Sequence, residues 1–438
     1  MLDKEKASEK NTGATKDMKI YTGVVGFFAW TFAVYDYVTF GDVLPYMGKS
    51  FGWTADYETF LATIVGVGVL IVSLLVGPMI DYFGRRKSLM ITSIGAALSS
   101  GFSSLTFSAV YLVIVRAFSG LGYSEQAVNS TFMSEILGKK TRGSLYSFVQ
   151  GGWPVGVLLA SLALVLLLPV VGWRGVYLVA TFPALVIGLS ALRLKESERF
   201  QHVQEIRKLK KQGKNTEAEA YGKEYRIDYS EAEKGTYMQL FDKKERKNTV
   251  FLAGSFMFSW IAIEIFIVFS TILLITYKGL PLSSSVLILI VSNGITYLGY
   301  VMFGFLGDRI SRRNVIAFAW IISAIMYTVF AFFSSGFAAS MVTYSLGLLF
   351  LIGPYSALFT YMGETYPTRN RGTGIAFINA MGPVGSIIGG ALFTVVLAVT
   401  ASYPDSMLIG AIALVIAGVL MFGARNVRPG QELEDIAT

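Results

Sequence analysis

Long apolar runs are the feature that most constrains the fold of this chain. Of its 438 residues, 53% are hydrophobic and only 15% are charged, whereas soluble domains carry about 25% charged residues. A helix needs roughly 20 mostly apolar residues to cross a bilayer. The sequence therefore predicts an all-α integral membrane protein with twelve transmembrane helices. These runs lie at residues 20–41, 57–80, 88–107, 109–132, 143–168, 173–193, 248–273, 284–306, 314–334, 337–362, 372–400 and 405–424.

The basic residues predict the orientation of these spans. Every Lys and Arg falls in the N-terminal tail, in a loop after an even-numbered span or in the C-terminal tail, except for Lys49, Arg116, Arg174 and Lys278. Cationic loops are retained in the cytoplasm, so we expect a multi-pass protein of the cell membrane with both termini cytoplasmic. The net charge of +8 is then a topology signal and gives no reason to expect nucleic acid as a partner.

The spans divide into two sets of six. The hydrophilic segment between them is predicted to be a solvated cytosolic linker, and a regulatory docking site is the alternative. The expected organisation is a tail at 1–19, a six-helix bundle at 20–193, the linker at 194–247, a second bundle at 248–424 and a tail at 425–438.

A duplicated loop indicates that the two bundles are repeats. Residues Gly77–Lys87 and Gly304–Asn314 both read Gly, three residues, Asp, three residues, Arg-Arg. A second pair lies at nearly the same offset, with Glu135 and Arg142 in one half and Glu364 and Arg371 in the other. A repeat of this length among membrane spans is typical of transporters whose substrate site lies between two similar halves.

Twelve spans, a long central loop and this duplicated loop resemble the major facilitator superfamily over essentially the whole chain. The resemblance implies two pseudo-symmetric six-helix bundles, with Asp81 and Asp308 closing the cytoplasmic side in the outward-open state. Tyr82 and Ser311 depart from the family pattern. The residues expected at this cytoplasmic gate are Asp81, Arg85, Arg86, Glu135, Arg142, Asp308, Arg312, Arg313, Glu364 and Arg371. A role in topology alone is the alternative.

Shorter motifs bear on the subfamily. Phe28–Tyr37, and the stretch from Arg116 to Glu125, are similar to proton symporters of organic acids such as sialate and lactate. Lys195–Phe200 and Gln150 resemble sugar porters, but Ser259–Glu264 lacks their Gln-Gln pair. The acid interpretation is therefore favoured over the sugar interpretation.

Among the ionisable residues of the predicted spans, four stand out: Asp36, Arg116, Glu125 and Glu264. Each costs about 2.5–3.5 kcal/mol at mid-span on insertion scales, so such residues are candidates for function. Asp36 and Arg116 lie at similar depths from the outer side, so they can face each other across a cavity. Glu125 lies about 13–14 Å deeper than Arg116 and about 180° around the helix, which excludes a simple same-face pair. Adding the sequence offset between the two duplicated loops to position 36 gives a position next to Glu264, so the two residues occupy nearly equivalent places in the two halves.

These charges suggest a coupling mechanism. Burial favours a neutral carboxyl group, whereas a nearby guanidinium favours the ionised form. The planar guanidinium group of arginine can also donate two parallel hydrogen bonds to a carboxylate. We therefore expect Arg116 to bind a substrate carboxylate, Asp36 to be the main protonation site, and Glu264 or Glu125 to tune coupling. A static Asp–Arg pair, and a structural hydrogen bond at Glu125, are the alternatives.

Polar and aromatic residues within apolar spans are further candidates for substrate binding, although each alone also suits a structural role. Gly151–Gly156 and Gly382–Gly385 occupy corresponding places in the two halves, which indicates helices that bend around a cavity or pack closely through glycine. The candidates are Tyr35, Tyr123, Asn129, Gln150, Trp153, Trp260, Asn293, Tyr297, Tyr355 and Asn379.

The sequence thus predicts a secondary active transporter, expected to be a monomer, that couples proton entry to uptake of a small organic acid anion. The alternatives are a proton-coupled sugar or polyol porter, a drug exporter and a non-transporting sensor. There is no phosphate-binding Gly-rich loop for ATP and no cysteine, and the single histidine, His202, lies in the linker. We therefore expect no enzyme activity, no cofactor and no metal; the partners are the substrate, protons and the bilayer.

Overall fold

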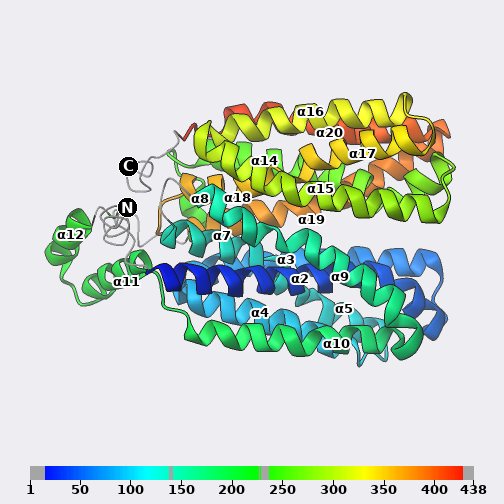
Figure 1. Cartoon of the computed structure of the whole chain (residues 1–438). Helices are drawn as coiled ribbons and strands as arrows, with labels where there is room; N and C mark the ends of the chain where they lie inside the picture. The colour runs from blue at the N-terminus through cyan, green and yellow to red at the C-terminus, as the bar shows by residue number, and fades with distance from the viewer. Residues whose placement is uncertain (1–14, 138–141, 226, 228–235, 428–438) are drawn as a thin grey trace. The chain divides into compact units, whose positions relative to one another are not determined.

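The computed structural model describes residues 15–137, 142–225, 227 and 236–427. All regular secondary structure in these ranges is helical (Figure 1). Within the described residues, ten helices are long and apolar enough to cross a membrane. The other two predicted spans correspond to α4 (Arg85–Ser103) and to the interrupted run α5 (Ala109–Ala117), α6 (Ser119–Tyr123) and α7 (Glu125–Ile136). The predicted twelve-span, all-α architecture is therefore confirmed.

The chain forms two compact units. One contains the described residues up to Arg246 together with Phe359–Phe377, and the other contains Lys247–Leu358 and the described residues from Ile378 onward. The segment Phe359–Phe377 lies within the second predicted bundle in sequence but belongs to the first unit. Besides α4 to α7, the first unit holds α2 (Lys16–Phe51), α3 (Ala55–Phe83), α8 (Arg142–Gln150), α9 (Gly152–Leu166), α10 (Leu168–Ser190), η1 (Ala191–Arg193), α11 (Glu198–Lys211), α12 (Asn215–Glu224) and α13 (Thr236–Leu240).

Helix α2 runs through the first unit and packs against α9 at glycine. Its first turn is capped by Thr15, whose hydroxyl accepts a hydrogen bond from the Met18 N–H, and it ends at Gly52 in the left-handed conformation. A Cβ at Gly156 of α9 would lie 2.5 Å from the Thr31 carbonyl oxygen and 2.7 Å from Val34 Cβ. Glycine is therefore what lets these two backbones approach, as is common between membrane helices.

Several predicted spans are interrupted. The fourth breaks at Phe118 and Ser124, one on each side of α6. The fifth breaks at Gly151, between α8 and α9, and α10 carries a kink at Gly172 (φ 65°). By contrast, α19 (Arg371–Thr400) continues through Pro383. The helix is thus interrupted at Gly151–Gly156 in the first half, whereas it is continuous at the corresponding segment Gly382–Gly385 in the second half.

The second unit also contains irregular helix. The seventh span begins as α14 (Arg246–Ile263) and continues as two π-helical segments, η2 (Glu264–Val268) and η3 (Ile272–Tyr277). Phe266 of η2 stacks on Tyr327 with ring centroids 3.7 Å apart, and its carbonyl accepts a hydrogen bond from Tyr344. The remaining helices are α15 (Leu282–Arg309), α16 (Arg312–Phe332), α17 (Gly336–Ile352), α18 (Tyr355–Thr365), which joins the two units, and α20 (Tyr403–Gly423).

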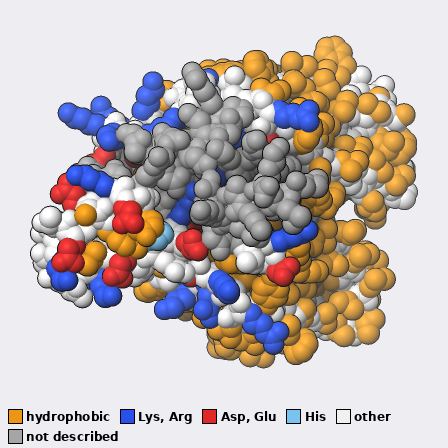
Figure 2. Space-filling model, turned by 60° about the vertical axis from the view of Figure 1, so that its left-hand side comes forward, with side chains coloured by type: hydrophobic (Ala, Val, Ile, Leu, Met, Phe, Trp, Pro, Cys, Tyr) orange, Lys and Arg blue, Asp and Glu red, His pale blue; other side chains and the backbone are white. Residues whose placement is uncertain are grey.

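Two polar helices, α11 and α12, follow the sixth span. In Figure 2 the Lys, Arg, Asp and Glu side chains gather at the end of the molecule that carries them, whereas hydrophobic side chains cover the flanks of the spanning helices. The helices pack through His202, whose ring stacks on Tyr225 with centroids 3.9 Å apart and whose Nδ1 lies 2.8 Å from the Tyr221 hydroxyl.

Enlarging Gly156 tests the close approach of α2 and α9. We expect Gly156→Ala to lower the melting temperature in detergent, since overpacking typically costs about 1–3 kcal/mol. Gly41→Ala is the matched control, because nothing lies within 4 Å of a Cβ at Gly41 and alanine favours helix over glycine. Equal melting temperatures for the two variants would contradict the packing argument.

The packing of α11 on α12 should depend on pH. Burial lowers the pKa of His202, so the folded state favours the neutral ring. The packing should therefore be intact above the usual histidine pKa of about 6.5 and weaken as the pH falls. Amide hydrogen exchange of α12, corrected for intrinsic rates, should accelerate between about pH 7.5 and about pH 5.5. His202→Gln, which cannot titrate, should remove this pH dependence; the same acceleration in that variant would exclude His202 as its source.

Candidate functional site

Asp36 and Arg116 form an ion pair inside the first unit. Arg116 Nη1 donates to Asp36 Oδ1 at 2.7 Å, and Nη2 donates to the Asp36 carbonyl at 3.3 Å. Both residues are at most 3% exposed. The guanidinium carbon lies 4.9 Å from the ring centroid of Phe40 and 5.6 Å from that of Tyr177. Arg116 is thus held by one carboxylate between two aromatic rings.

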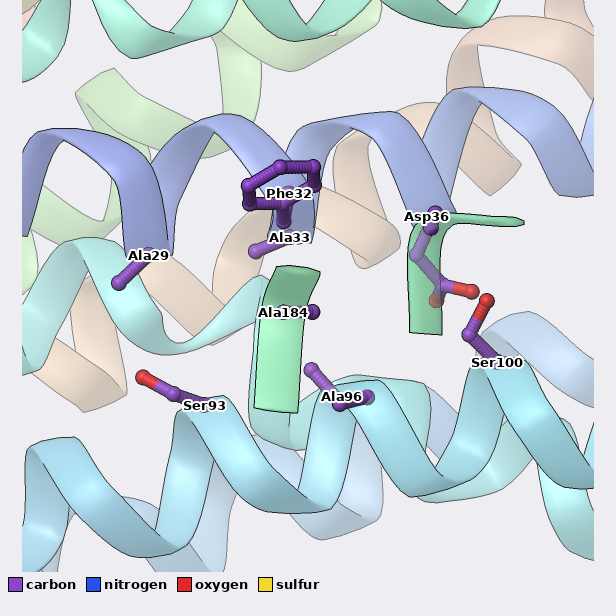
Figure 3. A pocket seen from close by; sticks show the side chains of 10 residues that line it. Ala29, Phe32, Ala33, Asp36, Ser93, Ala96, Ser100 and Ala184 are labelled. Carbon is purple, nitrogen blue, oxygen red and sulfur yellow. The ribbon is translucent and has the colours of Figure 1, made fainter. Parts of the chain in front are cut away.

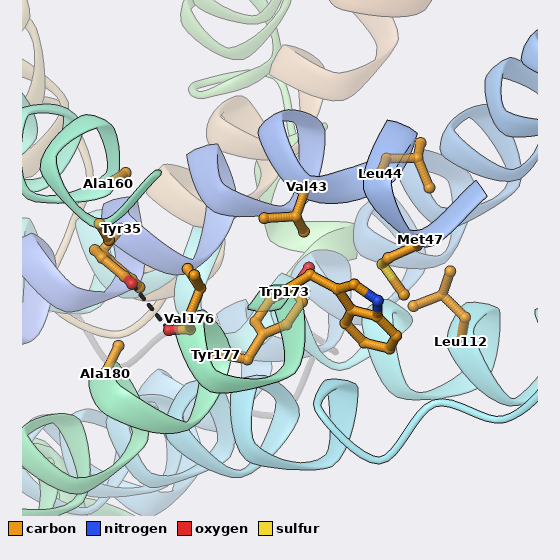
Figure 4. Packing of buried hydrophobic residues seen from close by; sticks show 11 residues of the cluster. Tyr35, Val43, Leu44, Met47, Leu112, Ala160, Trp173, Val176, Tyr177 and Ala180 are labelled. Carbon is orange, nitrogen blue, oxygen red and sulfur yellow. Dashed lines mark hydrogen bonds between the residues drawn. The ribbon is translucent and has the colours of Figure 1, made fainter. Parts of the chain in front are cut away.

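An apolar cluster lies beside this pair. Tyr35 lies in a cluster with Val43, Trp173 and Val176, and its hydroxyl donates to the Val176 carbonyl at 2.9 Å (Figure 4). Tyr177 belongs to the same cluster. A hydroxyl already bonded to the backbone is not free for a substrate, so Tyr35 supports the shape of this region in the structure described here.

Neither Glu125 nor Glu264 is a partner in this ion pair. Glu125 is fully buried at the start of α7, and its Oε1 accepts a hydrogen bond from Ser93 Oγ at 2.8 Å. Glu264, in the second unit, begins the π-helical segment η2. It packs against Gly389 and Gly390 of α19, where added Cβ atoms would lie 3.2 Å from Glu264 Cβ and 3.8 Å from its Oε1. Among the described residues, no group of three or more His, Cys, Asp or Glu is placed to hold a metal ion.

Glu135 is the centre of a second buried cluster in the first unit. Its carboxylate accepts hydrogen bonds from Arg85 Nε at 3.0 Å and Nη2 at 2.6 Å, from Arg371 Nη1 at 2.8 Å, and from the Ser197 hydroxyl. Arg85 also donates to the Thr368 carbonyl at 3.0 Å. One carboxylate therefore joins the first duplicated loop to the segment Phe359–Phe377.

Two carboxylates near this cluster cap helix N-termini. Asp81 accepts from the backbone N–H groups of Gly372 and Thr373, at 2.9 and 2.8 Å, at the start of α19. Glu196 accepts from the N–H groups of Arg85 and Arg86, at 3.0 and 3.2 Å, at the start of α4. Both contacts place negative charge at the positive end of a helix dipole. Burial raises the pKa of Glu196 against the opposing effect of Arg85.

The other gate candidates also form ion pairs or backbone contacts. Arg142 Nη1 donates to Glu364 Oε1 at 2.9 Å in the first unit. In the second unit, Arg312 Nη2 donates to Asp308 Oδ1 at 2.6 Å. The side chains of the second arginine in each loop donate to main-chain carbonyls: Arg86 to Leu192, and Arg313 to Phe422 and Ala424.

The remaining substrate-binding candidates of the first unit lie mostly in its interior. Asn129 Nδ2 donates to the Gly26 carbonyl at 3.2 Å, and Gln150 Oε1 accepts from Gln126 at 3.2 Å. Tyr123 is 3% exposed, with its ring centroid 5.8 Å from that of Tyr37. Trp153 is partly exposed and packs against Trp30.

The substrate-binding candidates of the second unit fall into two groups, buried and partly exposed. Tyr355 is buried, and its hydroxyl lies 2.9 Å from Ser259 Oγ; Trp260 and Asn379 are also buried. Asn293 and Tyr297 are partly exposed on α15, where Asn293 Nδ2 donates to the Leu289 carbonyl. The candidates are thus spread over two units, each with its own buried polar positions.

Several residues at these clusters were missed by the sequence analysis. Phe40 and Tyr177 flank Arg116, and Glu196 and Ser197 contact the Arg85 region. Arg207 of α11 donates to the Asp81 carbonyl. Only Glu196 and Ser197 carried a signal, since they lie within the Lys195–Phe200 stretch that resembles sugar porters.

Comparison with known proteins places the chain among transporters. Residues 26–354 and 252–437 match the Major Facilitator Superfamily. The cis,cis-muconate transport protein of Acinetobacter baylyi is 26% identical over 333 residues, covering 75% of each chain. The D-xylose transporter of Levilactobacillus brevis is 24% identical over 393 residues, covering 84% of this chain and 85% of that protein.

A solved structure also has this fold. The proton:xylose symporter XylE, bound to 6-bromo-6-deoxy-D-glucose, superposes with a TM-score of 0.76 at 17% identity. The match covers 97% of this chain and 99% of that one. At this identity the likeness concerns the fold alone.

Removing the charge of Glu135 should loosen the cluster that it joins. Breaking a buried ion pair leaves an uncompensated charge, at a cost of about 3–5 kcal/mol. The chain has no cysteine, so Ser130→Cys, at a position 2% exposed and bonded to the Phe359 carbonyl, provides a single reporter. We expect Glu135→Gln to increase the rate at which N-ethylmaleimide labels this cysteine.

Glu205→Gln is the control for this experiment, because Glu205 is a partly exposed residue of α11 whose carboxylate is paired with Lys208 at 3.3 Å. Labelling should be unchanged in that variant. Equal labelling in the Glu135 and Glu205 variants would show that Glu135 does not hold the segment Phe359–Phe377 in place.

Proposed function

Because the chain belongs to the Major Facilitator Superfamily, we propose that it carries a small organic acid anion into the cell together with protons, by alternating access. The observation that carries this proposal is the Asp36–Arg116 pair, a buried carboxylate whose charge is balanced by one guanidinium. Such a pair joins a proton-binding group to an anion-binding group within hydrogen-bond distance. The two binding events are then linked.

The contacts of Arg116 suggest the order of these events. While Asp36 is ionised, it occupies Nη1 of Arg116, and the aromatic rings cover the guanidinium. Protonation of Asp36 removes the charge that holds the arginine, which then favours another anion. A carboxylate fits this fork with two parallel hydrogen bonds. A proton thus has to bind before Arg116 engages the substrate, which couples the two.

The cluster around Glu135 supports the alternating-access part of the proposal. Opening of the cytoplasmic side would separate Asp81 from the start of α19 and Glu135 from Arg371. These contacts are hydrogen-bonded and buried, so they form a discrete closed state rather than a loose one. Positive residues in the loops on this side favour its assignment to the cytoplasm.

The relatives support the substrate class. A muconate transporter moves an acid, in agreement with the arginine in the first unit. The second candidate function is proton-coupled transport of a sugar or polyol, favoured by the D-xylose relative and by the fold shared with a proton:xylose symporter. In that case Arg116 would remain the partner of Asp36 throughout, and hydroxyl and amide groups would bind the substrate. Glu264 and Glu125 would tune coupling in either case.

Replacing Asp36 tests the proposed coupling. In proteoliposomes with cis,cis-muconate, the wild type should accumulate substrate under a pH gradient, up to about tenfold per pH unit for one proton per substrate, since tenfold corresponds to about 1.4 kcal/mol. Asp36→Asn should abolish this accumulation but retain exchange of preloaded substrate. Asp405→Asn, at an exposed position on α20, is the control.

Two outcomes would contradict the proposal. Uphill uptake unchanged in Asp36→Asn would remove Asp36 from the coupling mechanism. Accumulation of D-xylose but not of cis,cis-muconate by the wild type would favour the sugar function instead.

A further inference from the structure

The linker contributes the short helix α13 to the first unit, just before α14 begins. The hydroxyl of Tyr237 in α13 donates a hydrogen bond to the Leu74 carbonyl of α3. Burial raises the pKa of Tyr237, and the charge of Asp81 raises it further, so the hydroxyl keeps the proton that it donates. The linker is thus bound to the main chain of α3, a helix of the first predicted bundle.

A second set of contacts joins α13 to the segment Phe359–Phe377. The side-chain oxygen of Gln239 accepts a hydrogen bond from Arg369 Nε at 3.0 Å, and Gln239 is only 2% exposed. Phe241, the residue after α13, meets the ring of Phe377 edge to face, with centroids 5.6 Å apart. The same short stretch of linker therefore binds both α3 and this segment.

Helix α3 and the segment also touch each other directly. A Cβ at Gly77 of α3 would lie 2.7 Å from Thr373 Cα and 3.2 Å from Ala376 Cβ, so the two backbones meet at this glycine. Leu74 lies within one helical turn of Gly77, and Phe377 is next to Ala376 in sequence. The contacts of the linker are thus placed at the junction between α3 and α19.

We propose that Tyr237–Phe241 is a strap that holds the cytoplasmic side closed, and that the hydrogen bond from Tyr237 to Leu74 must break for this side to open. The inference rests on the proposed function, in which α3 parts from the start of α19 during alternating access. The strap bonds to both sides of the junction that has to separate, so it stabilises the closed arrangement.

The connections of the chain decide which contact breaks. The strap is followed directly by α14, which begins at Arg246, and the segment Phe359–Phe377 continues into α19. Both are therefore joined in sequence to the second predicted bundle, whereas α3 belongs to the first. When the bundles separate on the cytoplasmic side, the strap should stay with the segment and leave α3.

The strengths of the contacts agree with this direction. Gln239 accepts from a charged guanidinium, and such hydrogen bonds are roughly twice as strong as those between neutral groups. Tyr237 offers α3 one hydrogen bond between neutral groups, which shifts an equilibrium about two- to tenfold. A contact of this size biases the protein towards the closed arrangement and can still break in each transport cycle.

The strap can be altered without changing the lining of the pocket beside the Asp36–Arg116 pair. Figure 3 shows this pocket, in which Asp36 of α2 and Ser93 and Ser100 of α4 provide polar groups. Its lining comes from α2, α4 and α10, and none of the described residues that line it belongs to the strap. A variant of Tyr237 therefore tests closure separately from proton binding.

Cysteine labelling tests the strap without transport. Ser130→Cys is again the reporter, because Ser130 is buried where its hydroxyl bonds to the Phe359 carbonyl. We expect Tyr237→Phe, which removes only the hydroxyl, to raise the rate of N-ethylmaleimide labelling about two- to tenfold. Tyr111→Phe is the matched control, since the Tyr111 hydroxyl likewise donates to a backbone carbonyl, that of Phe102, at 3.2 Å.

A second variant acts on the other end of the strap. Phe241→Ala removes the ring that contacts Phe377, so it should also raise the labelling rate of the reporter. Phe241 is 50% exposed, so this variant remains decisive if Tyr237→Phe fails to fold. Unchanged labelling in both variants, or an equal rise in Tyr111→Phe, would overturn the strap.

Cross-linking in proteoliposomes tests which contact opens. Tyr237→Cys with Leu74→Cys, joined by a short bifunctional maleimide, should lose the uptake of cis,cis-muconate that the same variant shows before cross-linking. Phe241→Cys with Phe377→Cys, joined in the same way, should retain it. Uptake that persists with the strap linked to α3 would overturn the proposed opening. Absence of uptake in the wild type would instead contradict the proposed function, and the labelling rates would still decide whether the strap holds the closed arrangement.

Discussion

The pairing of charges within an apolar helical bundle is the constraint on which the rest of this structure depends. A charge in a membrane span must find an opposite charge or a set of hydrogen bonds. Arg116 does so with Asp36, and Arg85 and Arg371 do so with Glu135. Each solution fixes the relative position of helices that are distant in sequence. The same contacts that stabilise the fold are therefore those whose exchange would accompany transport.

The two clusters solve this problem in different ways. Asp36 and Arg116 form a pair near two aromatic rings, in which a single carboxylate balances a single guanidinium. Glu135 is held by two arginines and a serine, so a single proton leaves several of its contacts in place. Under the proposed function, the first arrangement suits a site that binds a proton, and the second suits a contact that opens when the backbone moves.

The number of spans and the repeat could be predicted from the sequence because hydropathy and spacing need no tertiary information. The similar depths of Asp36 and Arg116 could be estimated in the same way. The π-helical segment at Glu264 could not, because it depends on Tyr327 and Tyr344, which reach Phe266 from other helices. Nor could Ser93 be identified as the partner of Glu125, since serine is frequent along α4 and only packing selects one of them. The cap formed by Glu196 likewise could not be predicted, because Glu196 is distant in sequence from the N-terminus of α4 and reaches it only in the folded structure.

The capping of α19 by Asp81 has a consequence for how this protein tolerates sequence change. Asp81 binds the main-chain amides of Gly372 and Thr373, so the interaction does not require any particular side chain on the helix that it holds. The bond therefore does not specify the side chain of residue 373, although Thr373 is fully buried and its volume is limited by packing. Gly372 is different, because a Cβ there would lie 2.5 Å from Ile80 Cγ2 and 2.8 Å from Asp81 Oδ1. Sequence change at this junction is thus restricted by backbone clearance at Gly372 and by the buried position of Thr373.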